Sequence, residues 1–168
     1  MSHAVFTIGL ADRSMEQLLA LLHTHRVNCV ADVRWPPYSA SRPQFDRDAV
    51  DVALHFRRIQ YLFLGKELGP FATSSGRTRS GANATTAAFQ QGVKRIQGEL
   101  LHGRRVALLG TEKDPLACHR GIFIAPHLIS LGIAVRHIVD EELVADHHDL
   151  QQRVLDSLSN GLSEPVVR

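Results

Sequence analysis

Short apolar runs rich in β-formers alternate along this sequence with segments whose apolar residues repeat at helical spacing. The runs that we expect to form strands are residues 4–8, 28–33, 59–64, 105–109 and 133–139. Strands that alternate with helices favour a parallel sheet with right-handed crossovers and helices on both faces. The sequence therefore predicts a single-domain α/β fold, a three-layer sandwich with a mostly parallel sheet of about five strands.

Local signals place the helices between these strands. Ser14 and Gln17 have the spacing of a capping box, and Asp46 stands where it can cap a helix through Phe56. Further helices are expected at residues 86–101, from about Cys118, where Pro126 should kink or break the helix, and at 140–158. Residues 65–83 are rich in Gly, Ser and Thr and are expected to form a long loop. We take residues 1–158 as the domain and 159–168 as a tail.

Composition narrows the class of protein. With 168 residues, 44% apolar and 21% charged, the chain can bury a core and is not expected to be disordered. No apolar stretch is long enough for a bilayer, and no signal-peptide pattern is present, so we expect a cytoplasmic protein without a membrane partner. Two cysteines, Cys29 and Cys118, are too few for a disulfide framework. The sequence lacks phosphate-loop, dinucleotide and nucleophile-elbow motifs and has no metal-ligand spacing, so neither a cofactor nor a metal is expected.

Charged residues follow several of the predicted strands, and in parallel sheets ligands bind beyond the carboxyl ends of the strands. The densest cluster runs from Glu112 to Arg120 and leads into a helix, whose N-terminus suits an anion. Cys118 beside His119 at that position would have a lowered thiol pKa. The cluster predicts an anion pocket with an activated thiol, although buried packing of an inert Cys118 remains an alternative reading.

A second cluster, Asp32 and Arg34, closes the strand before Trp35. Asp32 is expected to orient an arginine of the site or to form a structural ion pair. The candidate catalytic residues are Glu112, Asp114, Cys118 and His119. The candidate ligand-binding residues are Asp32, Arg34, Arg42, Lys66, Glu67, Lys113 and Arg120. The expected ligand is a small anion or a nucleotide, and whether the site is catalytic is left open.

Charge is unevenly distributed and supports a different class of function. Residues 1–136 carry 17 Lys and Arg against 10 Asp and Glu, whereas residues 137–168 carry 2 against 7. A basic surface of this kind is compatible with nucleic-acid binding, although no motif of that class is present. The arginines available for it are Arg34, Arg42, Arg57, Arg58, Arg77, Arg79, Arg104 and Arg105. A homodimer is also an expectation, because two-fold dimers are the commonest oligomers.

Several of these motifs together resemble the small bacterial and archaeal proteins of domain of unknown function 488. The resemblance is carried by Thr7-Ile8-Gly9, Asp32-Val33-Arg34, Ser41 to Phe45, Tyr61 to Gly69, and Glu112-Lys113-Asp114-Pro115 with Cys118-His119-Arg120. It implies a compact α/β domain with a shared rim site and supplies no reaction. The chain has Gly9-Leu10-Ala11 where members usually have Gly-His-Ser. It has Gly110-Thr111 where many have a Cys, so any activity that depends on that His or Cys would be lost or altered.

A more distant similarity is to rhodanese-like sulfurtransferases, which also end a strand with Asp-Val-Arg and carry a nucleophilic Cys in a loop that ends in Arg. Here Gly110 follows the strand and Cys118 is only two residues before Arg120, so the active-site loop does not match. A cysteine-based sulfurtransferase or redox enzyme is therefore the third functional hypothesis.

Overall fold

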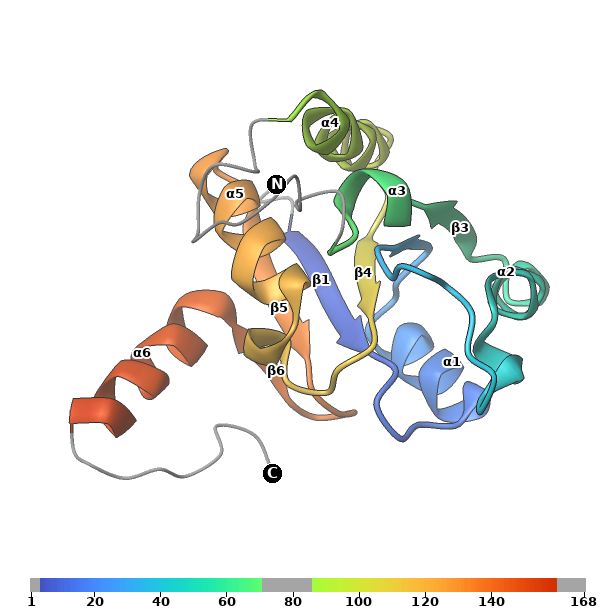
Figure 1. The fold of residues 1–168 in the computed structure, drawn as a ribbon, viewed down its shortest axis with the longest axis horizontal. Coiled ribbons are helices and arrows are strands. Elements are labelled where there is room, and N and C mark those ends of the chain that lie inside the picture. Colours follow the sequence, from blue (N-terminus) through green and yellow to red (C-terminus); the bar gives the residue numbers. More distant parts are fainter. Residues whose placement is uncertain (1–3, 71–85, 160–168) are drawn as a thin grey trace.

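A six-stranded sheet forms the centre of the computed structural model, which describes residues 4–70 and 86–159 (Figure 1). The strand order is β3-β2-β4-β1-β5-β6. The strands are β1 (Ala4–Gly9), β2 (Cys29–Asp32), β3 (Gln60–Phe63), β4 (Val106–Gly110), β5 (Ala134–Ile138) and β6 (Val144–Asp146). The first five are parallel, and β6 pairs antiparallel with β5 at one edge. The α/β class is confirmed, with six strands in place of about five.

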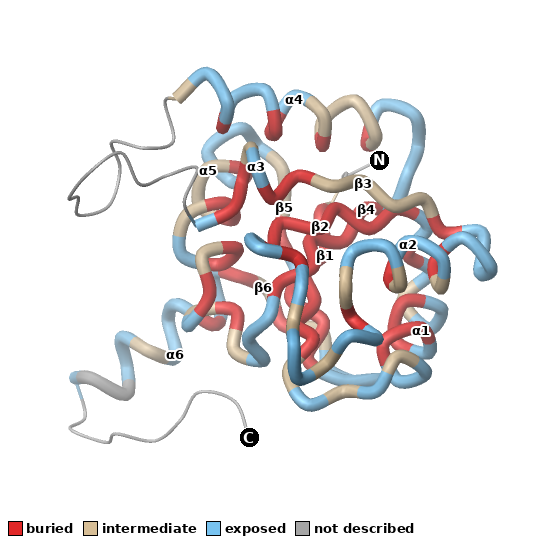
Figure 2. The backbone as a smooth tube through the Cα atoms, turned by 45° about the vertical axis from the view of Figure 1, so that its right-hand side comes forward, coloured by how far each residue is buried: buried red, intermediate tan, exposed pale blue. Residues whose placement is uncertain are grey.

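Helices cover both faces of this sheet, and Figure 2 shows the buried strands as a band between α4 and α1. One face packs against α1 (Met15–Thr24) and α2 (Arg47–Phe56) through residues such as Leu22 and Leu54. The other packs against α3 (Gly65–Leu68), α4 (Ala87–Leu101) and α5 (Ala125–Ser130) through residues such as Phe89, Ile96 and Leu128. β4 is buried along its whole length because it lies inside the sheet and is covered on both sides.

Helix starts follow from side-chain caps that the sequence displays. Ser14 accepts a hydrogen bond from the backbone N–H of Gln17 and the Gln17 side chain accepts one from the Ser14 N–H, which confirms the capping box. Thr86 caps α4 through the N–H of Phe89. Asp46 is the N-cap residue of α2, as predicted, but its carboxylate accepts from the Ser39 N–H at 2.8 Å and makes no cap hydrogen bond to the helix. A short 3₁₀ turn, η1 (Pro43–Phe45), precedes that helix.

The segment after β4 is less regular than the single helix predicted from Cys118. It contains a 3₁₀ turn, η3 (Pro115–Ala117), then a π-helical turn, η4 (Arg120–Ile124), which continues into α5. Pro126 lies in the first turn of α5, a position at which proline is common in helices. The expected break thus coincides with the change from π to α geometry.

Two further elements differ from the sequence prediction. The predicted loop 65–83 begins with α3, and residues 71–85 lie outside the described residues. The predicted helix 140–158 is replaced by a turn, β6, and the helix α6 (His147–Ser159), which extends away from the rest of the fold (Figure 1). Val144 and Ala145 pair with β5 because that strand would otherwise leave an open edge. The predicted tail, apart from Ser159, lies outside the described residues.

None of the helices in the described ranges is long and apolar enough to cross a membrane.

Replacing Ser14 with Ala should lower the free energy of unfolding by about 1 kcal/mol, because the Gln17 N–H at the start of α1 loses its acceptor. The matched control is Ser41→Ala, an exposed serine outside any helix, which should change the free energy by less than about 0.5 kcal/mol. Urea unfolding of both variants measures the difference, and equal values would show that the cap is not stabilising.

Candidate active site at the carboxyl ends of the strands

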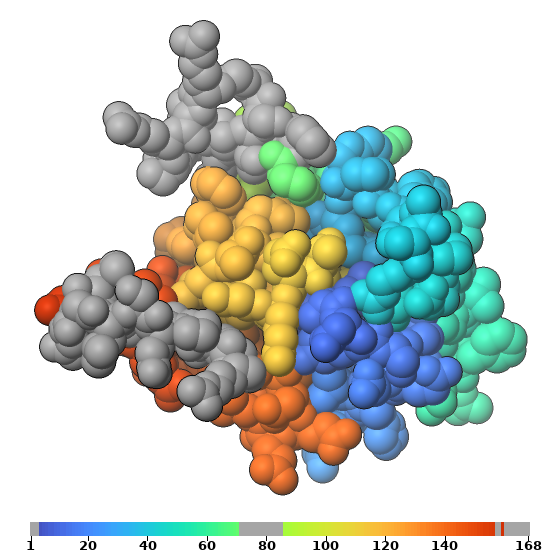
Figure 3. Space-filling model, turned by 60° about the horizontal axis from the view of Figure 1, so that its bottom comes forward, coloured from blue at the N-terminus to red at the C-terminus, as the bar shows by residue number. Residues whose placement is uncertain are grey.

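The loops after β1 and β4 run side by side at the carboxyl end of the sheet. The Leu10 N–H donates to the Gly110 carbonyl at 2.9 Å, and the Ala11 N–H donates to the Thr111 carbonyl at 2.8 Å. In Figure 3 the dark blue segment after β1 lies against the yellow segment after β4. The Glu112-to-Arg120 cluster is thereby held over the ends of the two central strands, as the strand rule predicts.

Arg120 is the most buried charged group of this cluster, with an exposed fraction of 1%. Its Nη2 donates to the backbone carbonyls of Glu112 (2.8 Å) and Lys113 (3.3 Å). Its Nε and Nη1 have no hydrogen-bond partner within the described residues, and none of the ion pairs found there involves it. A buried guanidinium with unused donors is costly, so this part of the fold is suited to receive an anion.

Two glycines make room for that guanidinium. A Cβ at Gly110 would lie 2.5 Å from Nη1 of Arg120 and 3.0 Å from Sγ of Cys118. A Cβ at Gly9 would lie 3.1 Å from Nη2 of Arg120 and would collide with the Glu112 carbonyl. The guanidinium and the thiol therefore meet over the backbone of Gly110, at the end of β4.

Cys118 is buried, with 6% of its surface exposed, and it contacts a histidine of fixed orientation. Its Sγ lies 3.7 Å from Nδ1 of His119. Nε2 of the same ring lies 3.0 Å from the Val33 carbonyl, which can only accept, so Nε2 carries a hydrogen. Nδ1 is then the nitrogen that exchanges a proton with the thiol.

These neighbours decide the pKa of the Cys118 thiol. Burial alone would raise it, but the His119 hydrogen bond, the charge of Arg120 and the Arg120 backbone N–H together lower it to about 6. The second cysteine is the opposite case, since burial and the carboxylate of Glu99 raise the pKa of Cys29 to about 12. Of the two cysteines, Cys118 is therefore the one whose pKa favours the thiolate at neutral pH.

Asp32 and Arg34 form a buried ion pair beside this site rather than an open anion receptor. Nε and Nη2 of Arg34 donate to the two carboxylate oxygens at 2.8 and 2.6 Å, and Nη1 donates to the Phe45 carbonyl. The hydroxyl of Tyr61 donates to the same carboxylate at 2.7 Å. The arginine of the predicted site that Asp32 orients is therefore Arg34. The pair thus holds the end of β2. The next residue is Val33, whose carbonyl accepts the hydrogen bond from His119.

The remaining predicted ligand-binding residues are dispersed. Arg42 donates to the carbonyls of Ala11 and Arg13, and its guanidinium lies over the Phe45 ring. On α3, Glu67 pairs with Arg95 of α4 at 2.7 Å, and Lys66 is exposed. Lys113 is also exposed and lines a hollow of about 280 Å³ together with Asp12, Arg13, Gln17, Val139 and Asp140.

Of the other predicted catalytic residues, only His119 contacts the thiol. The Asp114 carboxylate accepts from the Leu116 N–H at 2.8 Å and thereby caps η3. The side chain of Glu112 is exposed, and it is the backbone carbonyl of this residue that contacts Arg120. The structure therefore brings together Cys118, His119 and Arg120 from the predicted set.

Sequence reasoning missed a buried polar chain on the same face of the sheet. Oγ1 of Thr7 lies 2.7 Å from Nδ1 of His137, and Nε2 of His137 lies 2.9 Å from Nδ1 of His147. Nε2 of His147 has no partner in the described part of the chain. Burial first, then the charges of His147 and Arg120, lower the pKa of His137 to about 3. The signal that could have found His137 is its position between Val135 and Val139, which fixes it to an inward face.

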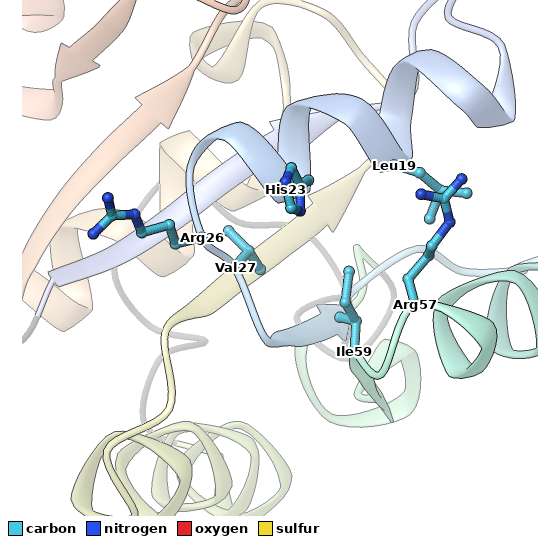
Figure 4. Close-up of a pocket in the computed structure, with 6 residues that line it drawn as sticks. All are labelled: Leu19, His23, Arg26, Val27, Arg57 and Ile59. Atoms are coloured by element: carbon cyan, nitrogen blue, oxygen red, sulfur yellow. The ribbon is translucent and has the colours of Figure 1, made fainter.

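Two hollows lie at opposite ends of the sheet. The one at the carboxyl end measures about 210 Å³ and is lined by Leu10, Arg34, Pro36, Tyr38, Ser39, Arg42, Phe45 and Thr111. The other, of about 290 Å³, is lined by Leu19, His23, Arg26, Val27, Arg57 and Ile59. Figure 4 shows the Arg57 side chain reaching toward Leu19 while that of Arg26 extends away from the group.

The arginines considered for nucleic-acid binding do not form one surface. Arg34 and Arg42 lie at the carboxyl end of the sheet and are engaged in the contacts above. Arg57, Arg58, Arg104 and Arg105 precede β3 and β4, at the amino end, where Arg104 pairs with Glu99 and Arg105 donates to the His25 carbonyl. Arg77 and Arg79 lie outside the described residues. Within the described ranges, no group of three His, Cys, Asp or Glu side chains could hold a metal ion.

Replacing Tyr61 with Phe should lower the free energy of unfolding by about 1.5–3 kcal/mol, because the buried Asp32 carboxylate loses a donor. Tyr38→Phe is the matched control, because Tyr38 is 55% exposed and its loss of a hydroxyl should cost less than about 0.5 kcal/mol. Denaturant unfolding compares the two variants. Equal costs would mean that Tyr61 contributes nothing specific to the pair.

Acid should destabilise the fold through His137. Its pKa is about 3 in the folded chain, against about 6.5 for a free histidine. The unfolded chain therefore binds the proton first as the pH falls below about 6.5. Stability should then fall by up to about 1.4 kcal/mol per pH unit until the pH nears the folded value. Unfolding midpoints at several pH values measure this slope. His137→Gln should flatten it and the exposed His23→Gln should not, and a slope unchanged by His137→Gln would contradict the assignment.

The comparisons with known proteins agree with the fold and the motifs. The family model described as "Domain of unknown function DUF488" matches residues 14–125, about two thirds of the chain, and this range includes Cys118, His119 and Arg120. A search of curated proteins found no match. Neither finding supports the similarity to rhodanese-like sulfurtransferases. The family match covers β2, β3, β4 and the segment that carries the site, and the chain belongs to the DUF488 family.

Proposed function

We propose that this chain is a small-molecule-binding α/β domain with enzymatic activity, in which the Cys118 thiolate is the nucleophile and Arg120 holds an anionic oxygen of the ligand. The observation that carries the proposal is the pair of unused donors on Arg120, 1% exposed, beside the ionised thiol over Gly110. Charge-assisted hydrogen bonds in such a dry site are strong, because little water competes for the donors.

Each of the three side chains has a separate role. His119 takes the thiol proton on Nδ1, because its Nε2–H is already donated to the Val33 carbonyl. Arg120 holds the thiolate form by its charge and offers Nε and Nη1 to an oxygen of the ligand. The Asp32–Arg34 pair and Tyr61 position the strand end that carries Val33, so they support the site without touching the ligand.

The donors that are available favour a small anionic ligand over a nucleotide. The hollow of about 210 Å³ beside Arg34 and Arg42 is not lined by Cys118, His119 or Arg120. The guanidiniums of Arg34 and Arg42 are already engaged with Asp32, Phe45 and backbone carbonyls, so they are poorly placed to take a phosphate chain. A compact ligand near Cys118 uses the donors that are still unpaired.

The test compares two alkylating agents of similar size, neutral iodoacetamide and anionic iodoacetate, in a Cys29→Ser background. We expect a reaction governed by a pKa of about 6, because ionisation of Cys118 limits it. The rate ratio of iodoacetate to iodoacetamide should exceed that of the urea-unfolded chain, because Arg120 attracts the carboxylate. Phosphate and sulfate should slow both reactions by occupying the site.

The matched variant is His119→Gln, which removes the proton acceptor and should move the alkylation pKa from about 6 towards that of a free thiol, about 8.5. An alkylation pKa near that of a free thiol in the parent protein would overturn the proposal. A rate ratio equal to that of the unfolded chain would do the same, since it would remove the anion-binding role of Arg120.

A further inference from the structure

The geometry around Cys118 points to a particular substrate class: we propose that this thiol reduces small hydroperoxides, with Arg120 stabilising the oxygen that leaves. This inference rests on the proposed function, because it uses the same thiolate and the same guanidinium. It goes further by stating which electrophile the thiolate attacks and what the reaction forms.

Access to the sulfur limits the size of the electrophile. Cys118 is 6% exposed, and the donors of Arg120 that face it are buried. The sulfur lies over the backbone of Gly110, and its flank is occupied by the His119 ring. A hydroperoxide of a few atoms fits this limit, and it presents negative charge to Arg120 only as its O–O bond breaks.

The donors of Arg120 favour an electrophile whose leaving group carries its negative charge on oxygen. Nε and Nη1 have no hydrogen-bond partner among the described residues, and Nη1 lies against the same point of Gly110 as the sulfur of Cys118. N–H groups fixed in a buried site stabilise charge that develops on an oxygen during a reaction. In a hydroperoxide this charge develops, as the O–O bond breaks, on the oxygen that leaves, which is one atom beyond the oxygen that the sulfur attacks.

The step balances with the groups present. The Cys118 thiolate attacks one peroxide oxygen, an S–O bond forms and the O–O bond breaks. The departing oxygen takes the proton that His119 holds on Nδ1 and leaves as water or an alcohol. The sulfur is oxidised by two electrons to a sulfenic acid, and the hydroperoxide is reduced by the same two electrons. Arg120 then donates to the oxygen of the sulfenic acid.

The second cysteine cannot take part in the next step. Cys29 is paired in register with Val106, and Gly110, beside the Cys118 sulfur, is four residues further along β4. Four residues of strand span about 13 Å, whereas the Cα atoms of a disulfide lie within about 7 Å of each other. The sulfenic acid is therefore returned to the thiol by two molecules of an external low-molecular-weight thiol, which leave as their disulfide, with release of water.

The experiment measures the rate of sulfenic acid formation with hydrogen peroxide, by mass spectrometry of the dimedone adduct, in the full chain carrying Cys29→Ser. The reference is the urea-unfolded chain, with each rate divided by its thiolate fraction. We expect the folded chain to react about 100-fold to 1,000-fold faster, which is the range of effect of one preorganised donor on an oxyanion. A folded chain that reacts no faster than the reference overturns the inference.

Two variants separate the role of Arg120 from thiol ionisation. Arg120→Lys keeps a charge but not the same donors, and Gly110→Ala places a Cβ where Nη1 lies. Either should slow the peroxide reaction more than the iodoacetamide reaction, because iodide leaves without charge on oxygen. Equal slowing of both reactions would contradict the role of Arg120. A normal alkylation profile with anion protection, but no peroxide acceleration, would retain the proposed function and reject the hydroperoxide.

Discussion

A guanidinium buried between the sheet and the segment after β4 is the constraint around which this end of the molecule is arranged. Arg120 needs acceptors, and the carbonyls of Glu112 and Lys113 supply them only because the loop after β4 turns back over β1. It needs space, which Gly9 and Gly110 provide. It also needs an anion, and the thiol of Cys118 is the ionisable group beside it with a lowered pKa. Many members of the resembled family carry Cys where this chain has Gly110, and a Cβ there would displace the guanidinium from this position.

A second buried charge pair sets the position of the histidine. Asp32 and Arg34 satisfy each other within the end of β2, with Tyr61 and the Phe45 carbonyl completing their hydrogen bonds. Breaking a buried pair of this kind leaves an uncompensated charge and costs about 3–5 kcal/mol. The pair therefore holds the Val33 carbonyl in place, and His119 depends on that carbonyl for its orientation. Asp32 and Arg34, which the sequence suggested as ligand contacts, thus position the Val33 carbonyl and through it His119.

The buried chain of Thr7, His137 and His147 adds a further electrostatic condition. Neutral histidines beside Arg120 avoid a second positive charge in the same layer, and the lowered pKa of His137 keeps that residue neutral at physiological pH. His147 also ties the start of α6 to the sheet, although most of that helix extends beyond it (Figure 1). This polar chain thus joins β1 to β5 and to the start of α6.

The sequence by itself determined the α/β class, the first five strands, the capping box at Ser14 and the cluster that contains Cys118, His119 and Arg120, because period, caps and strand ends are local properties. It could not give the partner of the Asp46 carboxylate, the pairing of β6 with β5 or the polar chain through His137, since these contacts form only when the segments meet in the fold. Only the tertiary structure decided which arginine is paired with Asp32 and which is left with free donors. The reason is physical: burial and the distance to an acceptor set the free energy of a charge, and both are fixed when the strands assemble.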